Sequence, residues 1–263
     1  MHRSLKIPWE GGDRTVNASH ADKIERLRHM IHDADNIVFF GGAGVSTESG
    51  IPDFRSAGGL YSERAGRRSI SPEEILSHTF FMNHTDEFYE FYKSKMIYRH
   101  ARPNDAHLAL ARLEREGRLR AVITQNIDGL HQQAGSREVL ELHGSVHRNY
   151  CMNCRRFHGL DHVLAADGVP VCEECGGIVK PDVVLYEEAL DMDILGKSRQ
   201  YIERADMLIV AGTSLTVYPA AGLIQFFGGR HLVLINKSPT PYDHAATLVI
   251  NDSIGETLRQ AVN

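Results

Sequence analysis

Short runs of consecutive apolar residues recur along the chain and alternate with segments that have the spacing of amphipathic helices. The expected strands are the apolar runs at 37–40, 121–124, 139–142, 207–210, 232–235 and 248–250. Apolar strands that alternate with helices are typical of a parallel sheet whose two faces are both covered. The pattern therefore predicts an α/β fold built on a parallel sheet.

Helix start signals precede several of the segments between these strands. Ser19 to Asp22 has the form of a capping box. Ser71 followed by Pro72 is typical of an N-cap and a first helical residue. The remaining expected helices run over 86–98 and 105–116, and one begins at 218.

Two segments, 56–102 and 147–180, interrupt this alternation of strands and helices. We interpret both as insertions that pack together as a smaller helical and metal-binding domain. The larger domain, which contains the sheet, then comprises residues 19–55, 103–146 and 181–263. A ligand cleft between two such bodies is the expected place for chemistry.

The composition is that of a soluble globular protein. The 263 residues include 42% hydrophobic residues and carry a formal net charge of −5. This acidic balance argues against nucleic acid as a partner, since phosphate contacts need a basic surface. No apolar stretch approaches the ~20 residues that span a bilayer, and Met1 to Trp9 lack the apolar core of a secretory signal. A cytoplasmic protein without a membrane partner is expected.

A glycine-rich turn, from Gly42 to Gly50, follows the first expected strand. Gly42 and Gly44 lack a Cβ, so their backbone N–H groups are expected to approach phosphate oxygens, as in dinucleotide-binding sheets. Thr47 stands where the usual third glycine would be, and Pro52 soon forbids a regular helix. The alternative is a tight turn that binds nothing.

The loop beyond this turn contains Asp53, Phe54 and Arg55, an aromatic residue flanked by opposite charges. This arrangement suits a ring that covers a nicotinamide and a guanidinium that pairs with a phosphate. The alternative is a solvated loop with one buried phenylalanine.

Polar side chains also stand at the carboxyl ends of two further strands, where open α/β sheets bind their ligands. Gln125, Asn126 and Asp128 offer amide and carboxylate groups to ribose hydroxyls and to a carboxamide. His143 follows the next strand, where a neutral imidazole is placed to take a proton from a ribose hydroxyl. Helix capping is the alternative role of Asn126 or Asp128, and most of the 15 histidines are surface residues with no role.

Two later strands end in polar residues as well. Thr213 and Ser214 follow the run 207–210, and Asn236 and Lys237 follow the run 232–235. Their side chains suit the adenine ribose and the phosphates of a dinucleotide. Helix capping is the alternative for Thr213 and Ser214.

The four cysteines form two Cys-x-x-Cys pairs, Cys151 with Cys154 and Cys172 with Cys175. Two such pairs at this separation suit a tetrahedral zinc site. Four thiolates close the coordination sphere, so the zinc is expected to be structural. Disulfides or a redox pair are the alternatives, and disulfides are rare in the cytosol.

Together these blocks resemble the sirtuins, the NAD-dependent protein deacylases. The matching motifs are GAGVSTESGIPDFR at 42–55, TQNIDGLH at 124–131, ELHGS at 141–145, the two Cys-x-x-Cys pairs and GTSL at 212–215. They stand in family order over about residues 20–260. The resemblance implies a Rossmann-like domain with a small inserted helical and zinc-ribbon domain, and substrates that meet in the cleft between them.

The resemblance also implies roles for individual residues. His143 corresponds to the catalytic base, and Asn126 to the residue that orders the ribose and its water. Asp128 and Ile127 correspond to the pocket for the nicotinamide carboxamide. The other cofactor contacts that it implies are Ala43, Thr47, Asp53, Phe54, Arg55, Gln125, Thr213, Ser214, Asn236, Lys237 and Ile254. The implied contacts with a substrate peptide are Val184 and Tyr186.

The implied reaction removes an acyl group from a lysine side chain, with NAD as cosubstrate and one structural zinc per chain. Its products are nicotinamide, O-acyl-ADP-ribose and free lysine. The acyl-lysine protein or peptide is expected to add as a strand in the cleft. Protein mono-ADP-ribosyl transfer and a non-catalytic NAD-sensing adaptor are the alternatives.

Two departures from the family pattern bear on the substrate. The docking segment usually reads Phe-Gly-Glu, whereas this chain has Tyr186, Glu187 and Glu188, and the added acid favours basic peptides. Sirtuins that prefer acidic acyl groups carry a Tyr-x-x-Arg pair, but here Tyr92 is followed by Lys95, which lacks the bidentate fork of arginine. Deacetylation is therefore expected to dominate, with weak desuccinylation as the alternative that Lys95 leaves open, and core packing is the alternative role of Tyr92.

Overall fold

The computed structural model describes residues 19–53 and 70–262. Phe54 and Arg55, both predicted to contact a cofactor, lie outside the described residues. The main sheet is parallel throughout and has six strands in the order β3-β2-β1-β7-β8-β9. Its strands are β1 (Ile37–Gly41), β2 (Leu119–Thr124), β3 (Val139–Glu141), β7 (Met207–Ala211), β8 (His231–Ile235) and β9 (Leu248–Ile250). The predicted α/β fold with a parallel sheet is confirmed.

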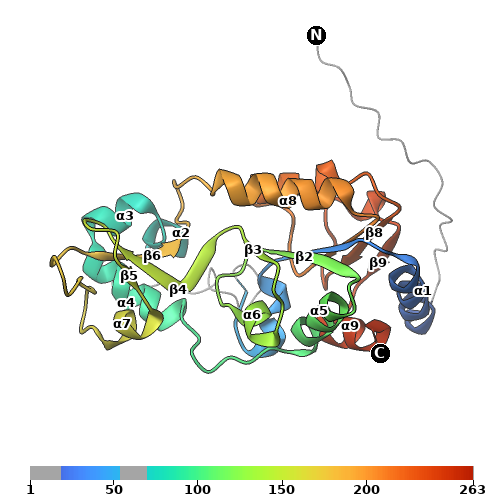
Figure 1. Ribbon diagram of the computed structural model, residues 1–263, viewed down its shortest axis with the longest axis horizontal. Helices are drawn as coiled ribbons and strands as arrows, with labels where there is room; N and C mark the ends of the chain where they lie inside the picture. Colours follow the sequence, from blue (N-terminus) through green and yellow to red (C-terminus); the bar gives the residue numbers. More distant parts are fainter. Residues whose placement is uncertain (1–18, 54–69, 263) are drawn as a thin grey trace, which may run out of the picture.

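Two apolar layers sandwich this sheet because successive side chains of a strand point to opposite faces. In β1, Ile37 and Phe39 belong to one buried cluster, and Val38 and Phe40 belong to the other. Figure 1 shows helices on both sides of the sheet. Those that cover the first face are α1 (His20–Asp33), α5 (Asp105–Arg115) and α9 (Ile254–Val262), and those that cover the second are α8 (Met192–Arg204) and the 3-10 segment η4 (Ala220–Phe226).

The predicted helix starts are confirmed where a capping side chain precedes an apolar stripe. Ser19 and Asp22 form a reciprocal capping box at the start of α1. Ser71 accepts a hydrogen bond from Glu74 N, with Pro72 as the first residue of α2 (Pro72–Ile75). Helix α8 is absent from the sequence-based expectations, although Ile194, Leu195, Tyr201 and Ile202 form an apolar stripe along it that packs on the second cluster.

A second, antiparallel sheet has three strands in the order β5-β4-β6 and lies at the left of Figure 1. Its strands are β4 (Gly144–Cys151), β5 (Phe157–His158) and β6 (Val179–Val183). It shares a buried aromatic cluster with α3 (His78–Asn83) and α4 (Thr85–Lys95), and α7 (Leu160–Ala165) packs against β4. Segments from both predicted insertions therefore pack together, while the domain boundaries given above remain a prediction.

Strand β4 contains a three-residue bulge. Ser145 pairs with Asp182, and the next paired residue, Asn149, faces Pro181 directly beside it. Residues 146–148 thus have no partner in β6, and bulges of this kind re-aim side chains near functional sites. Because β4 starts directly after His143, the bulge lies close to the predicted catalytic residue.

Among the described residues, no helix has the length and apolar content that a bilayer crossing demands.

Two histidines lie in the core between α5 and α6 (Leu130–Ala134). His107 and His131 are both fully buried, and their ring centroids are 4.7 Å apart. Burial lowers the pKa of His107 to about 4, and burial together with the neighbouring His107 ring lowers the pKa of His131 well below its usual value. Neither nitrogen of His131 has a hydrogen-bond partner among the described residues.

This pair predicts that acid destabilises the fold. The unfolded chain takes up protons near pH 6.5 and the folded chain only at lower pH, so stability is complete above pH 6.5 and is lost as pH falls. His107 contributes a loss of about 2 kcal/mol between pH 7 and pH 5. Urea titrations should show that His131→Leu, similar in volume but without a proton site, loses less stability over this range than the wild type.

The exposed His29 provides the control. His29→Gln removes a histidine whose side chain is 73% exposed and lies outside the buried pair, and it should reproduce the wild-type pH dependence. Identical pH dependence in His131→Leu and the wild type would show that the buried pair does not set the acid limit.

Candidate active site

The carboxyl ends of β1, β2, β7 and β8 lie at one edge of the main sheet, as parallel pairing requires. Gly41 at the end of β1 pairs with Thr124 on one side and with Ala211 on the other. Ala211 in turn pairs with Ile235 at the end of β8. The polar segments after these four strands therefore converge at the edge where open α/β sheets bind ligands.

The glycines of the first turn allow the backbones of two loops to lie in close contact. A Cβ on Gly44 would lie 2.6 Å from Gly212 Cα, so only glycine allows this contact. The N–H groups of Gly42 and Gly44 donate to Ala211 O and Gly212 O at 3.2 and 2.9 Å. The N–H groups of Gly42 and Gly44 are therefore bonded to the end of β7 and to the turn after it, and an approach of other N–H groups of the glycine-rich turn to phosphates remains a prediction.

A chain of hydrogen bonds links the ends of three strands. Gln125 Nε2 donates to Thr213 Oγ1 at 3.1 Å, and Thr213 N donates to Asn236 Oδ1 at 3.0 Å. Asn236 is buried, and its Nδ2 has no partner among the described residues. Buried amide donors are rarely left unsatisfied, so this group is suited to a polar ligand at the site.

Ser46 connects the two polar residues that follow β2. Its hydroxyl donates to Asp128 Oδ2 at 2.7 Å and accepts from Asn126 Nδ2 at 3.0 Å. Ser46 was not among the predicted site residues, although its place inside the glycine-rich motif, where it is buried, is the signal that could have identified it. The structure thus unites Asn126 and Asp128 through a third residue.

Asp128 is half-buried, and each of its carboxylate oxygens accepts one hydrogen bond. Its Oδ1 accepts from Leu130 N at 2.9 Å, but the N-cap of α6 is Gly129, so this bond is a local turn contact and the alternative of helix capping by Asp128 is wrong. Burial raises the pKa of Asp128, and the negative charge of Glu141 adds to this effect. The hydrogen bonds from Leu130 and Ser46, together with His147, act in the opposite direction.

His143 occupies the turn between β3 and β4, beside the Gln125–Asp128 loop. Its Nδ1 lies 3.0 Å from the carbonyl oxygen of Gln125 and must donate to it, which leaves Nε2 with the lone pair. Burial lowers the pKa of His143, partly offset by this hydrogen bond. The imidazole is therefore neutral near pH 7 and can accept a proton at Nε2.

A cavity of about 300 Å³ adjoins this loop. Asp128, Gly129 and Leu130 form one wall, and residues 96–99 between α4 and α5 form another. This size lies at the lower end of the range for small-molecule pockets. Asp128 therefore borders a hollow on the side of the smaller sheet.

The other predicted cofactor residues differ in their surroundings. Thr47 Oγ1 donates to Gly44 O at 3.0 Å, and Ser214 Oγ is 2.8 Å from Thr216 Oγ1. Lys237 is exposed just after β8, whereas Ile254 is buried in the core beneath α9. Ala43, Asp53 and Ile127 are half-buried. A cofactor contact by each of these residues remains a prediction.

The predicted docking segment continues β6 and contacts the turn that holds His143. Val184 N donates to His143 O at 3.0 Å, and Tyr186 is part of a bridge with Ser77. Glu187 has a φ of 74°, a conformation that favours the glycine of the family pattern. Its carboxylate accepts hydrogen bonds from Thr79 N at 2.9 Å and from Thr79 Oγ1 at 2.7 Å. These bonds hold the segment in place despite the unfavourable backbone.

Tyr92 is fully buried, and its ring stacks on Phe88 with centroids 5.4 Å apart. Core packing is therefore a role of this residue. Burial raises the pKa of its hydroxyl far above the usual value, and that hydroxyl has no hydrogen-bond partner among the described residues.

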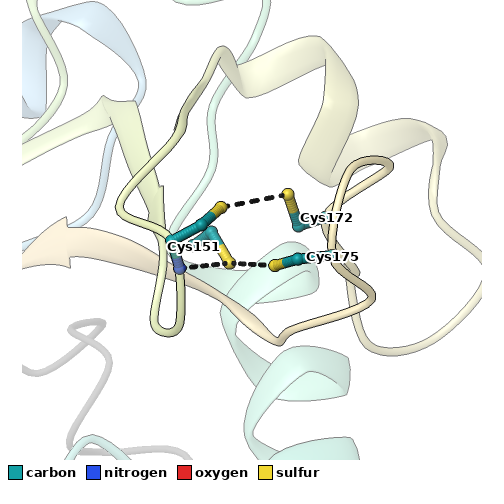
Figure 2. Close-up of side chains that lie close together, drawn as sticks. Cys151, Cys172 and Cys175 are labelled. Carbon is teal, nitrogen blue, oxygen red and sulfur yellow. Dashed lines mark hydrogen bonds between the residues drawn. The ribbon is translucent and has the colours of Figure 1, made fainter.

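The four cysteines converge in the smaller lobe: Cys151 and Cys154 come from the end of β4 and the turn after it, and Cys172 and Cys175 from the segment before β6. Their sulfur atoms all lie within 4.8 Å of one another, with 3.3 Å between Cys151 and Cys175 and 3.7 Å between Cys154 and Cys172. Figure 2 shows Cys151, Cys172 and Cys175 pointing toward a common centre. Tetrahedral zinc with 2.3 Å bonds requires sulfur separations of roughly 3.8 Å, so the donor set fits zinc. None of the four is in a disulfide.

Metal analysis should find about one zinc per chain. Cys172→Ser should lose the metal and lower the free energy of unfolding by roughly 3–5 kcal/mol, because metal binding stabilises the folded module. Met152→Ser, at an exposed position between Cys151 and Cys154 of the other knuckle, is the control and should keep both metal and stability. Full metal content and wild-type stability in Cys172→Ser would contradict a four-thiolate structural site.

Comparison with known proteins agrees with this geometry. Residues 42–219 match the Sir2 family. The NAD-dependent protein deacetylase of Clostridium tetani is 60% identical over 238 residues, which cover 90% of this chain and 96% of that protein. A solved Sir2–p53 peptide–NAD+ complex has 39% identity and a TM-score of 0.79, over 90% of this chain and 96% of that one. A Sir2 structure bound to a propionylated peptide has 38% identity and a TM-score of 0.78, over the same shares. The chain is a member of the Sir2 family.

Proposed function

We infer that this chain is an NAD-dependent protein-lysine deacetylase. The observation that carries the inference is the placement of His143, whose Nδ1 is bound to Gln125 O beside the Asn126–Ser46–Asp128 group. A clostridial relative at 60% identity is named for this activity. Site and family membership therefore support the same reaction.

The polar edge of the main sheet fits NAD. Asn236 Nδ2 is a buried donor without a partner among the described residues, and Thr213 is anchored beside it. These groups suit ribose hydroxyls or phosphate oxygens, while Asp128 suits the amide donors of a carboxamide. NAD supplies a nicotinamide leaving group and an electrophilic ribose carbon.

His143 acts as the general base in this proposal. Its Nδ1 hydrogen bond fixes the tautomer, so the proton from a ribose hydroxyl arrives at Nε2. Burial keeps the imidazole neutral at pH 7, ready to accept that proton. Asn126 is held by Ser46 and is proposed to orient the same sugar.

The substrate is an acyl-lysine peptide that lies along residues 184–186. Val184 is bonded to the backbone of His143, which brings this segment to the proposed base. A related Sir2 structure holds a propionylated peptide, which supports short uncharged acyl groups. Lys95 offers a single point charge rather than a bidentate fork, so acetyl-lysine is preferred over succinyl-lysine.

His143→Ala should lower kcat for deacetylation of an acetyl-lysine peptide by at least ~100-fold, because a general base contributes 10²–10⁴-fold. Turnover of the wild type should persist at pH 6.5, the ordinary pKa of a histidine, and should fall only at lower pH, because burial lowers the pKa of His143 and the protonated ring cannot accept a proton. Release of nicotinamide and loss of the acetyl mass from the peptide are the measurements. His29→Ala, at an exposed position, is the control.

Intact deacetylation by His143→Ala would refute the assignment of the base. Transfer of ADP-ribose mass onto protein without loss of acetyl groups would favour an ADP-ribosyltransferase. NAD binding without turnover of acetyl, propionyl, succinyl or myristoyl peptides would favour a sensor.

A further inference from the structure

The bulge of β4, residues 146–148, contacts the loop that carries Asp128 and the strands on either side of the His143 turn. Val146 N donates to Ile127 O at 3.0 Å, and His147 Nε2 donates to Asp128 O at 3.0 Å. These two residues hold the backbone of the loop that carries Asp128. The third bulge residue, Arg148, points to two carboxylates on other strands.

Arg148 joins Glu141 at the end of β3 to Asp182 in β6. Its Nη1 lies 2.5 Å from Glu141 Oε2, and its Nε lies 2.7 Å from Asp182 Oδ2. The Glu141 side chain is only 7% exposed, and its other oxygen accepts from Gln132 Nε2 at 2.9 Å. Arg148 is therefore the cation that neutralises a buried carboxylate, and removal of one partner of such a pair is costly.

The two carboxylates hold the chain on both sides of His143. Glu141 precedes His143 by two residues. Asp182 lies beside the turn, in the neighbouring strand β6. Its backbone packs directly against Gly144, because a Cβ on Gly144 would lie 1.9 Å from Asp182 O. The φ of Gly144 is +76°, so the turn has little freedom to relax. A single guanidinium thus braces the strand before the base and the strand beside it.

We propose that Arg148 is a positioning residue of the deacetylase, whose guanidinium clamps Glu141 to Asp182 and so fixes the His143 turn against the Asp128 loop. The proposal rests on the function inferred above. It adds, to the residues that contact substrates, a residue that positions them from the junction between the two sheets. Arginine suits this place because its planar fork reaches two carboxylates at once, which the single ammonium of lysine does not.

The clamp also has an electrostatic consequence for Asp128. The groups that face Asp128 are Ser46, Leu130 N, His147 and Glu141, and of these Glu141 raises the pKa of Asp128 by its charge. Arg148 balances that charge. Loss of Arg148 should therefore raise the pKa of Asp128 further, whereas loss of the Glu141 charge should lower it. Loss of Arg148 and loss of the Glu141 charge break the same ion pair, but they shift the pKa of Asp128 in opposite directions.

The test compares Arg148→Met with Glu141→Gln in the full chain. NAD+ binding is measured by calorimetry from pH 4.5 to pH 8, and deacetylation of an acetyl-lysine peptide is measured in parallel. The acid midpoint of NAD+ binding should rise by about half a pH unit in Arg148→Met and fall by a similar amount in Glu141→Gln. The value of kcat/KM at pH 8 should fall about tenfold or more in Arg148→Met, because small misplacement of catalytic groups is expensive.

Arg148→Lys separates charge from geometry. It should keep the wild-type acid midpoint because the positive charge remains, while kcat/KM stays well below wild type because a compact ammonium on a flexible stem does not fix the two carboxylates in the geometry of the planar guanidinium fork. Arg199→Met is the matched control, since Arg199 pairs with Glu203 within α8 on the surface, and it should change neither quantity.

Midpoints that move in the same direction in Arg148→Met and Glu141→Gln would overturn the proposal, as would wild-type kcat/KM in Arg148→Lys. Should Arg148→Met fail to fold, the acid midpoint of NAD+ binding and kcat/KM are measured in Glu141→Gln and Arg148→Lys instead. Absence of deacetylation in the wild type with NAD+ binding intact would refute the proposed function instead, and the opposed midpoints would still test the clamp.

Discussion

Parallel pairing of β1 with both of its neighbours is the constraint on which the rest of the structure depends. Gly41 is in register with Thr124 and Ala211, and Ala211 is in register with Ile235. The chain therefore leaves four strands at the same level and on the same edge. Hydrogen bonds can then run across the strand ends, from Gln125 through Thr213 to Asn236. Without this alignment, the polar residues would be separate helix caps and loop residues.

The second sheet brings the turn that holds His143 to this edge. Strand β3 pairs with β2 in the main sheet, and β4 pairs with β5 and β6 in the smaller one. His143 lies at the point where the chain passes from one sheet to the other. This place explains why so many backbone contacts surround it: Gln125 on one side, and Val184 in the continuation of β6 on the other.

Burial has opposite consequences for the two titratable groups of the site. It favours the uncharged form of each, so it lowers the pKa of His143 and raises that of Asp128. For His143, the uncharged form is the one that can accept a proton, as a general base requires. For Asp128, hydrogen bonds from Ser46 and Leu130 oppose the effect of burial and support the charged form. The same low-polarity surroundings thus allow two different roles, set by the local donors.

The sequence by itself determined the α/β class, the helix starts at Ser19 and Ser71, the cysteine quartet and the family, because local propensity, capping and ligand spacing act over short stretches. It also identified Asn126, Asp128 and His143 as candidates from their places at strand ends. Only the tertiary structure decided that Ser46 bridges Asn126 and Asp128. It also decided that the N–H groups of Gly42 and Gly44 donate to the carbonyl groups of Ala211 and Gly212. It alone joined Glu141, Arg148 and Asp182. Such contacts depend on the register of strands distant in sequence, which no local pattern encodes.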